Sequence, residues 1–395
     1  MSAKLPGLEA RLAAEIADSG PIPFERFMER ALYDPEDGYY ASGKCAIGRD
    51  GDYFTNVSIG PVYGEILAGQ FVEMWQALGR SADFVLVEQG AGDGQLARDI
   101  LGALDSTPLA GVPLVIVEPS SALRRAQAET LAGHGVSWVA DAEALPELCG
   151  VHYSNELFDA VPVHLVRSTR EGWAELYVDR ADKAFAWREM PVGGELAEAV
   201  ANFPVRPKGF TTEVCLAHRP LLQTLAARIT RGFLLAVDYG MSRESLLAEH
   251  RTDGTLSCYR GHRRDSNPLE APGDKDLTAH VNFSLLAEDA IRVGWQFENL
   301  ADQHHFLVGA ATALLLSLDG KPPGPESGKK LRSLRMLLHP EGMGRQFQAI
   351  LFSKGISGAN LSGFQHAGKS GLNLKVTTPP IATTSEVRRA RSSAG

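Results

Sequence analysis

The feature of this 395-residue chain that most restricts its fold is a glycine-rich stretch at residues 85–97, which reads VLVEQGAGDGQLA. An apolar run typical of a strand leads into Gly90, Gly92 and Gly94, and a sequence typical of a helix follows at once. Glycines at alternate positions let backbone N–H groups approach a ligand closely where a strand turns into a helix. The stretch therefore predicts an α/β fold with a ligand-binding turn at the end of a strand.

Further apolar runs recur along the chain after this point. They lie at 84–88, 114–118, 137–139, 152–155 and 233–238, and segments typical of helices at 96–104, 122–131 and 142–148 follow the first three. Strands that alternate with helices imply parallel βαβ units, because a parallel connection needs a crossover. We therefore expect a mostly parallel sheet with helices on both faces.

Three other regions surround this predicted core, which spans residues 81–354. Residues 1–80 favour a helical N-terminal region. An insertion at about 163–230 contains VHLVRS, WAELYVD and AFAWRE, which predict antiparallel strands at the edge of the sheet. Residues 355–395 carry five basic residues against a single acid, with no apolar periodicity, and this composition predicts a disordered basic tail.

The composition argues against several classes of protein. No apolar run reaches the ~18–20 residues of a membrane span, and a net charge of −9 argues against a broad nucleic-acid surface. The four cysteines include no C-x-x-C pair, and we predict no metal site. The first 20 residues mix acids with helically spaced leucines, unlike a signal or transit peptide, which favours a cytoplasmic location.

Acidic residues stand beside the glycine turn and at the ends of the next strands. Glu88 precedes the turn and Asp93 lies inside it, while Glu118 ends the second strand and Asp141 follows the third. Two carboxylates at the turn would repel a pyrophosphate but suit a cation. S-adenosyl-L-methionine carries a sulfonium and an amino group, and acid-x-G-x-G-x-G is the spacing of class I methyltransferases. We predict that Glu88 and the three glycines bind this cofactor, with Glu118 on its ribose and Asp141 on its adenine.

A nicotinamide dinucleotide is the main competing ligand, since an acid after the second strand serves it equally well. Its fingerprint, G-x-G-x-x-G, needs a glycine at position 95, where this chain has Gln95. The glycine spacing therefore favours S-adenosyl-L-methionine.

The fourth strand ends in a polar run, SNELFDAVP, at the edge where open α/β sheets bind their ligands. We predict that Asn155 binds the cofactor and that Glu156 and Asp159 are catalytic. A pair of carboxylates can hold a guanidinium group through bidentate, charge-assisted hydrogen bonds. Structural functions stay open at this point, since Asp159 can cap a helix and Glu156 can pair with a nearby arginine.

More polar residues follow in later loops. Asp238 ends the fifth strand, Tyr259 and His262 lie in YRGH, and His280 lies in DLTAHVNF. Loops on a rigid scaffold are where site residues gather. We therefore predict that Asp238, Tyr259 and His262 bind the substrate and that His280 accepts a proton, although either histidine can equally be structural.

Taken in order, the motifs of this chain resemble one known family. GPIPFERFMERALYDPEDGYY, GDYFTNVSIGPVYGEILA, LVEQGAGDG, SNELFDAVPVHLV, GTLSCYRGH and DLTAHVNFSLLAE occur within residues 8–354. They are similar to the MidA-like methyltransferases, the family of the mitochondrial respiratory complex I assembly arginine methyltransferase. The resemblance implies a Rossmann-like class I enzyme that uses S-adenosyl-L-methionine and modifies an arginine of a protein, such as a respiratory-complex subunit. It also implies that Thr55, Gly64 and Glu65 close over the site, with Thr55 and Glu65 on the substrate.

The chain departs from the family pattern at a few positions. Gln89 and Ala91 replace the usual Leu and Pro of the glycine turn, and Asn282 replaces an Asp in H-V-D-F. A substrate carboxylate is missing if that Asp contacts the substrate. Three functions therefore stay open: arginine methylation, methylation of a small molecule or another protein side chain, and a cofactor-binding assembly factor without turnover. The oligomeric state is not predicted.

Overall fold

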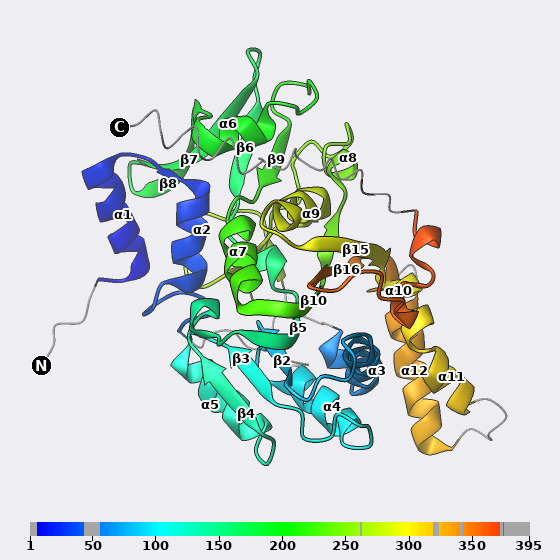
Figure 1. Ribbon diagram of the computed structural model, residues 1–395. Helices are drawn as coiled ribbons and strands as arrows, with labels where there is room; N and C mark the ends of the chain where they lie inside the picture. Colours follow the sequence, from blue (N-terminus) through cyan, green and yellow to red (C-terminus); the bar gives the residue numbers. More distant parts are fainter. Residues whose placement is uncertain are drawn as a thin grey trace, which may run out of the picture.

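The computed structural model describes residues 6–42, 56–260, 263–318, 324–339, 343–371 and 374. Within these residues, the centre of the molecule is an eight-stranded sheet in the order β15-β16-β10-β5-β2-β3-β4, with β14 paired to β10 (Figure 1). The strands are β2 (Phe84–Gln89), β3 (Leu114–Val117), β4 (Val136–Val139), β5 (Leu148–Asn155), β10 (Ile229–Met241), β14 (Val281–Asn282), β15 (Gln296–Asp302) and β16 (Phe347–Lys354). The pairs from β10 to β4 are parallel, and β16 is antiparallel to its neighbours β10 and β15. The predicted α/β class is confirmed.

Helices cover both faces of this sheet, as predicted, and successive residues of β2 show why. Leu86 and Val87 are both fully buried, but they pack into different clusters on opposite faces, as alternate residues of a strand covered on both sides do. One face carries α3 (Val62–Ala77), α4 (Gln95–Leu104), α10 (Gln303–Ala310) and α12 (Pro325–Leu338). The other carries α7 (His218–Arg228) and α9 (Phe283–Arg292) (Figure 1).

The order of the strands fixes where a ligand can bind. The chain starts the sheet at β2, adds β3 and β4 on one side, and then adds β5 and β10 on the other. The carboxyl ends of β2 and β5 therefore lie side by side at the point where the strand order reverses. A crevice forms at such a point because the connections leave in opposite directions.

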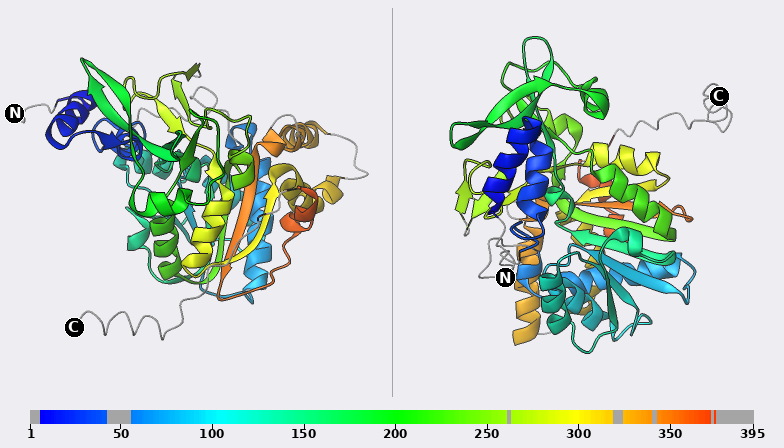
Figure 2. Two further views of the ribbon diagram at one scale, coloured as in Figure 1. Left: turned by 90° about the horizontal axis from the view of Figure 1, so that it is seen from above. Right: turned by 90° about the vertical axis from the view of Figure 1, so that its left-hand side faces the viewer.

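The inserted strands form a sheet of their own. β6 (His164–Ser168), β7 (Trp173–Ala181), β8 (Ala184–Pro191) and β9 (Thr211–Val214) pair with each other and with β1 (Ile22–Pro23). The prediction that they lie at the edge of the central sheet is wrong. Their apolar side chains, such as Leu176 and Val178, pack in one cluster with α1 (Leu8–Ser19) and α2 (Phe24–Tyr33) (Figure 2). The two helices thus cover the apolar face of the inserted sheet.

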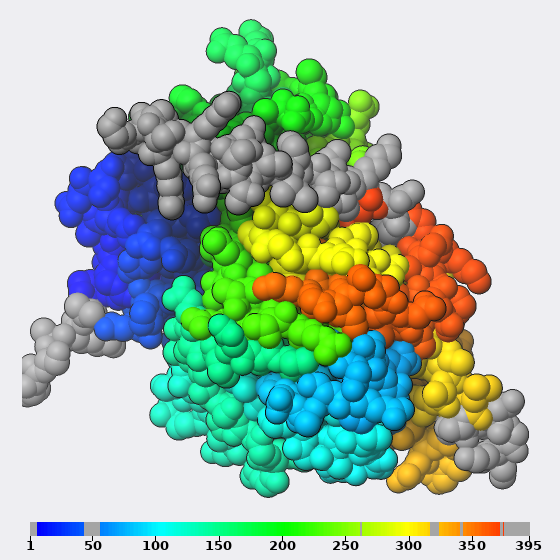
Figure 3. Space-filling view, in the orientation of Figure 1, coloured from blue at the N-terminus to red at the C-terminus, as the bar shows by residue number. Residues whose placement is uncertain are grey.

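The N-terminal 80 residues do not pack as one unit. α1 and α2 lie against the inserted sheet, whereas α3 packs on α4 and the central sheet. α10 to α12 stand on the flank of the molecule opposite α1 and α2 (Figure 3); α11 is Thr312–Leu318. The predicted domain boundaries stay a prediction, but the helical part of residues 1–80 divides between two layers.

Two local predictions are corrected by the structure. The helix expected at 142–148 is only a 3-10 turn, η2 (Ala142–Ala144), and β5 begins at Leu148. Pro146 explains the early end, since a residue before proline avoids the helical conformation.

The tail expected to be disordered from 355 is ordered over most of its first part. η5 (Ser362–Phe364) and η6 (Ala367–Lys369) place Leu361, Phe364 and Ala367 in the main core. The backbone N–H of Ser362 also donates to Glu73 at 2.7 Å. The apolar residues recur every three positions, a period that the sequence analysis did not use.

Candidate active site

A cavity of about 1040 Å³ lies at the carboxyl ends of β2, β3, β5 and β10. Residues 88, 90–93 and 118–121, at the ends of β2 and β3 and just after them, line what we call the glycine side. Residues 155–157 and 159–160, at the end of β5 and just after it, line the carboxylate side together with residues 276 and 278–280. Because β5 and β10 stand beside β2 and β3 in the sheet, the two sides face one crevice at the point where the strand order reverses.

The glycine turn has a backbone that side chains would strain. Gly90, Gly92 and Gly94 have φ angles of 77°, 55° and 86°, in the left-handed region. A Cβ on Gly90 would also meet Leu157 at 3.3 Å, so this turn lies close to the loop after β5. Gly90 and Gly92 line the cavity, which leaves backbone without side chains at its surface.

Glu118 on the glycine side is held in place by its neighbours. Its Oε1 accepts from Ser120 N at 2.8 Å, and its Oε2 accepts from Gln127 Nε2 at 3.2 Å. Gln127 is itself fixed, since Nε2 also donates to Gly92 O and Trp138 Nε1 donates to Oε1. Burial raises the pKa of Glu118, and the hydrogen bonds from Ser120 and Gln127 oppose that shift. The carboxylate is therefore oriented by the protein alone.

The other two predicted cofactor acids are placed differently. Glu88 lines the cavity and accepts from Tyr153 Oη at 2.8 Å, and burial raises its pKa to about 8. Asp141 is exposed and is not among the residues that line the cavity. Its Oδ1 accepts from Ala144 N at 2.9 Å and caps η2, so the structure does not bring it to the predicted adenine position.

The loop after β5 is held in an unusual conformation. Glu156 has a φ of 56°, which non-glycine residues adopt rarely and often at functional sites. Its N–H donates to Val237 O at 2.9 Å. Asp238 lies beneath the loop, fully buried, and its Oδ2 accepts from Leu157 N at 3.0 Å and Phe158 N at 2.7 Å. Asp238 thus anchors the loop and, contrary to the prediction, does not line the cavity.

Three carboxyl groups line the carboxylate side: Glu156, Asp159 and Asp276. Burial, and then the charge of Asp159, raises the pKa of Glu156 to about 8. Burial and the charges of Asp238 and Asp276 raise the pKa of Asp159 well above its usual range. Asp276 Oδ1 accepts from Tyr40 Oη at 2.7 Å. No lysine or arginine of the described part of the chain lines the cavity.

An aromatic wall completes this side. His280, Tyr239, Tyr259 and Tyr33 line the cavity, and Tyr33 Oη donates to Ala160 O at 3.0 Å. The His280 ring stacks on Tyr239 with centroids 6.2 Å apart. Burial lowers the pKa of His280 to about 4, so its imidazole is neutral at neutral pH.

Two predicted residues of the N-terminal block, Gly64 and Glu65, are not among the residues that line the cavity. Glu65 pairs with Lys330 of α12 at 2.8 Å. Gly64 lets α3 approach α4, because a Cβ there would meet Asp99 at 2.7 Å. Two predicted substrate residues lie outside the described residues: Thr55 and His262.

Asn282 replaces the Asp of the family motif, and its side chain stabilises a helix end. Its Oδ1 accepts from Leu285 N at 3.1 Å and caps α9, and it does not line the cavity. Asparagine and aspartate are equally good N-caps. The replacement of Asp by Asn282 therefore removes no carboxylate from the cavity.

The sequence analysis missed Tyr33, Tyr40 and Asp276, which all line the cavity. Tyr33 and Tyr40 lie in ALYDPEDGYY, and Asp276 begins DLTAHVNF. Both motifs belong to the family resemblance and could have pointed to these residues. The residue pattern alone, however, does not predict that either motif lies beside the strand ends.

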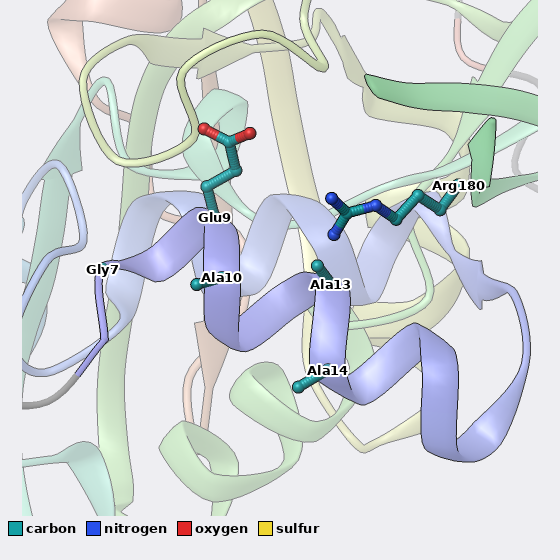
Figure 4. A pocket seen from close by; sticks show the side chains of 6 residues that line it. All are labelled: Gly7, Glu9, Ala10, Ala13, Ala14 and Arg180. Carbon is teal, nitrogen blue, oxygen red and sulfur yellow. The ribbon is translucent and has the colours of Figure 1, made fainter. Parts of the chain in front are cut away.

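A second, smaller hollow of about 520 Å³ lies between α1 and Arg180 of β7 (Figure 4). It is lined by Gly7, Glu9, three alanines and that arginine, and it contains none of the predicted site residues. No group of His, Cys, Asp and Glu among the described residues could hold a metal ion. Within the same residues, no helix is long and apolar enough to cross a membrane.

Comparison with known proteins agrees with this geometry. Residues 66–300 match the model of a family described as "Putative S-adenosyl-L-methionine-dependent methyltransferase". The mitochondrial protein arginine methyltransferase NDUFAF7 of Danio rerio is 32% identical over 85% of this chain and 84% of that protein. The Homo sapiens protein of the same name is 30% identical over 85% of this chain and 81% of that protein. A methyltransferase-like protein from Burkholderia thailandensis, solved with S-adenosyl-homocysteine bound, is 33% identical with a TM-score of 0.82, covering 93% of this chain and 98% of that chain.

Proposed function

This chain belongs to the family of S-adenosyl-L-methionine-dependent methyltransferases, and from that premise we propose that it methylates an arginine side chain of a protein. S-adenosyl-L-methionine is its cofactor. The relatives named protein arginine methyltransferases support this acceptor. The observation that carries the proposal is the group of three carboxyls that line the cavity of the glycine turn: Glu156, Asp159 and Asp276. Asp159 and Asp276 are buried, and Glu156 is half-buried.

These carboxyl groups suit a cationic acceptor. Each of Glu156 and Asp159 has its pKa raised by burial and by a neighbouring carboxylate, so ionising both without a cation is unfavourable. A guanidinium group between them would stabilise the ionised forms, and its planar set of donors fits two carboxylates at once. A phenolate or carboxylate acceptor would instead be repelled. The cavity therefore favours arginine over anionic acceptors.

The glycine side fits the cofactor. Bare backbone at Gly90 and Gly92 permits close approach, and the fixed carboxylate of Glu118 can accept from ribose hydroxyls. We propose that these residues, with Glu88, Gly94 and Asn155, hold the cofactor. When bound, S-adenosyl-L-methionine supplies a methyl group on a positively charged sulfur, which leaves as a neutral thioether.

The residues of the carboxylate side then have distinct functions. Glu156 and Asp159 orient the guanidinium so that one nitrogen faces the methyl group, which lowers the entropic part of the barrier. The nitrogen that takes the methyl group would lose a proton. His280 is neutral because burial lowers its pKa, and we assign it as the acceptor of that proton. Tyr259 lies on the same wall and would contact the substrate.

A test requires purified protein, methyl-labelled cofactor and cell lysate. We expect label in methylarginine after hydrolysis of the proteins, and a strong loss of label with Asp159→Asn. Asp182→Asn, the same change on the exposed hairpin between β7 and β8, is the matched control and should label normally. Label confined to small metabolites would contradict the proposal, and cofactor binding without any transfer would favour an assembly factor.

We also propose a respiratory-complex subunit as the acceptor protein. This part of the proposal rests on the family resemblance alone. The curated relatives are named as mitochondrial proteins, whereas we propose a cytoplasmic location for this chain. Identifying the labelled peptides by mass spectrometry would name the acceptor. Fractionating the source cells with an antibody to this chain would decide the location.

A further inference from the structure

Asn155, at the end of β5, lines the cavity next to Glu156 and is hydrogen-bonded to residues behind the cavity wall. Its Nδ2 donates to Glu156 Oε1 at 2.8 Å. Its Oδ1 accepts from Tyr63 Oη at 3.0 Å and from Asn56 Nδ2 at 3.4 Å. An amide has one acceptor end and one donor end, so two donors on Oδ1 turn the NH₂ group toward Glu156.

The next residues of the network are fixed in the same way. Asn56 Nδ2 also donates to Gln303 Oε1 at 2.7 Å, and Gln303 Nε2 donates to Asn56 Oδ1 at 2.9 Å. Gln303 Nε2 gives its second hydrogen to Leu337 O at 3.3 Å. A backbone carbonyl can only accept, so Leu337 dictates which end of Gln303 is the donor. That choice sets the orientation of Asn56 and then of Asn155.

The part of the network behind Asn155 is buried. Asn56 and Gln303 are fully buried, and Tyr63 is 1% exposed, whereas Asn155 is half-buried. Both hydrogens of Asn56 Nδ2 and both of Gln303 Nε2 have acceptors, and Asn155 Oδ1 has two donors. Turning the Asn56 or the Gln303 amide would place like ends together where water is excluded, which costs about 1–3 kcal/mol for each hydrogen bond lost. A single polarity is therefore strongly favoured.

The members come from distant parts of the chain. Asn56 precedes η1 (Val57–Ile59), Tyr63 lies on α3, Gln303 on α10 and Leu337 on α12. Asn56 and Gln303 are 247 residues apart in sequence. The network therefore connects the helices on one face of the sheet to the loop that carries Glu156.

We infer that Asn56, Tyr63 and Gln303 are positioning residues, which fix the Asn155 amide so that it donates a hydrogen bond to Glu156. This inference rests on the function proposed for Glu156. Within the block TNVSIGPVYGE, it assigns Asn56 and Tyr63 to the site, where the resemblance had pointed to Thr55 and Glu65.

The test measures the ionisation of Glu156 without any acceptor, so it stays separate from the test of arginine methylation. Infrared spectra of the full chain are recorded across pH, and subtracting those of Glu156→Gln isolates the protonated carboxyl band of Glu156. The same subtraction is made in the Tyr63→Phe background and in Gln303→Met. Because a fixed donor favours the carboxylate, losing it should move the midpoint to higher pH, by about one unit for Tyr63→Phe.

Gln303→Met keeps the side-chain length and removes both ends of the amide, so it should move the midpoint in the same direction. It also provides a second reading if one variant does not fold. Tyr177→Phe on the inserted sheet removes a hydroxyl away from the cavity and should leave the midpoint unchanged. A folded Tyr63→Phe or Gln303→Met variant that titrates like the original chain, even with a lower melting temperature, would overturn the inference. So would an equal shift in Tyr177→Phe.

Discussion

Both sides of the cavity carry a glutamate whose pKa is raised by burial, but the surroundings of the two glutamates differ. On the glycine side, both oxygens of Glu118 accept hydrogen bonds from within the protein. On the carboxylate side, Glu156 accepts one hydrogen bond, from Asn155, and lies near the charge of Asp159. On the glycine side, the Glu118 carboxylate is oriented before any ligand arrives, an arrangement that we propose suits neutral hydroxyl groups. On the carboxylate side, Glu156 ionises only as the pH rises through about 8, and a nearby cation would favour its ionised form at lower pH.

Glu88 on the glycine side and Glu156 on the carboxylate side have similar pKa values, but their neighbours differ. Burial raises the pKa of each to about 8. At Glu88 the hydrogen bond from Tyr153 opposes the shift and Asp93 adds little, whereas at Glu156 the second cause is the charge of Asp159. A guanidinium ligand should therefore affect the ionisation of Glu156 more than that of Glu88.

The largest expected effect is on methyl transfer in Glu156→Gln. We expect turnover to fall by about 10²–10³-fold, because a positioned charge is lost from the reacting group. Binding of S-adenosylhomocysteine, measured by calorimetry, should change by less than about twofold, since an amide at Glu156 leaves the glycine turn and Glu118 intact. If binding falls as much as turnover, the two sides do not act separately and the comparison fails.

A smaller effect is expected from Glu118→Gln on the glycine side. One oxygen of the amide can still accept from Ser120 N, but the charge and one acceptor are lost. A hydrogen bond to a charged group contributes about 1.5–3 kcal/mol. Affinity for S-adenosylhomocysteine should thus fall by roughly 10–100-fold, with turnover at saturating cofactor nearly preserved. A loss of turnover with unchanged affinity for S-adenosylhomocysteine would instead show that Glu118 acts on the acceptor and not on the cofactor.

The pH dependence of stability should reveal the ionisation of Glu156. The ordinary pKa of Glu156 is 4.5 and its folded pKa is about 8, so the protonated form is favoured on folding. Its contribution to stability is full below pH 4.5 and is lost as the pH rises through 8. Relative to Glu156→Gln, the original chain should lose up to about 1.4 kcal/mol per pH unit in this window.

Added agmatine, a small guanidine, sharpens the same measurement. It should raise the melting temperature at pH 8 in the original chain and in Glu88→Gln, but not in Glu156→Gln. Thermal unfolding across pH provides both readings. Equal stabilisation of the two variants would show that the guanidinium does not bind at the carboxylate side.

The comparison also explains what the sequence could predict. The glycine side is local: Glu88, the three glycines and Glu118 follow two strands in a row, and their spacing is visible in the sequence. The carboxylate side joins the end of β5 with Tyr40 and Asp276, which lie far apart in the chain. Periodicity and spacing contain no information about such a meeting. For the same reason, Asp141 and Asp238 were predicted from strand ends, and their hydrogen bonds to backbone N–H groups were not.

The smallest expected effect is that of Asn282→Asp, which restores the residue usual in the family motif. Because the side chain caps α9 and does not line the cavity, aspartate should cap equally well, and stability should change by less than about 0.5 kcal/mol. Turnover and cofactor affinity, measured as for Glu156→Gln, should stay within about twofold of the original. A gain in activity of tenfold or more would mean that this position reaches the substrate. It would also support the alternative that the original chain is an assembly factor without turnover. An unchanged rate would show that the departure from the family affects the helix cap alone, and that the carboxylates at 156, 159 and 276 are the ones available to the acceptor.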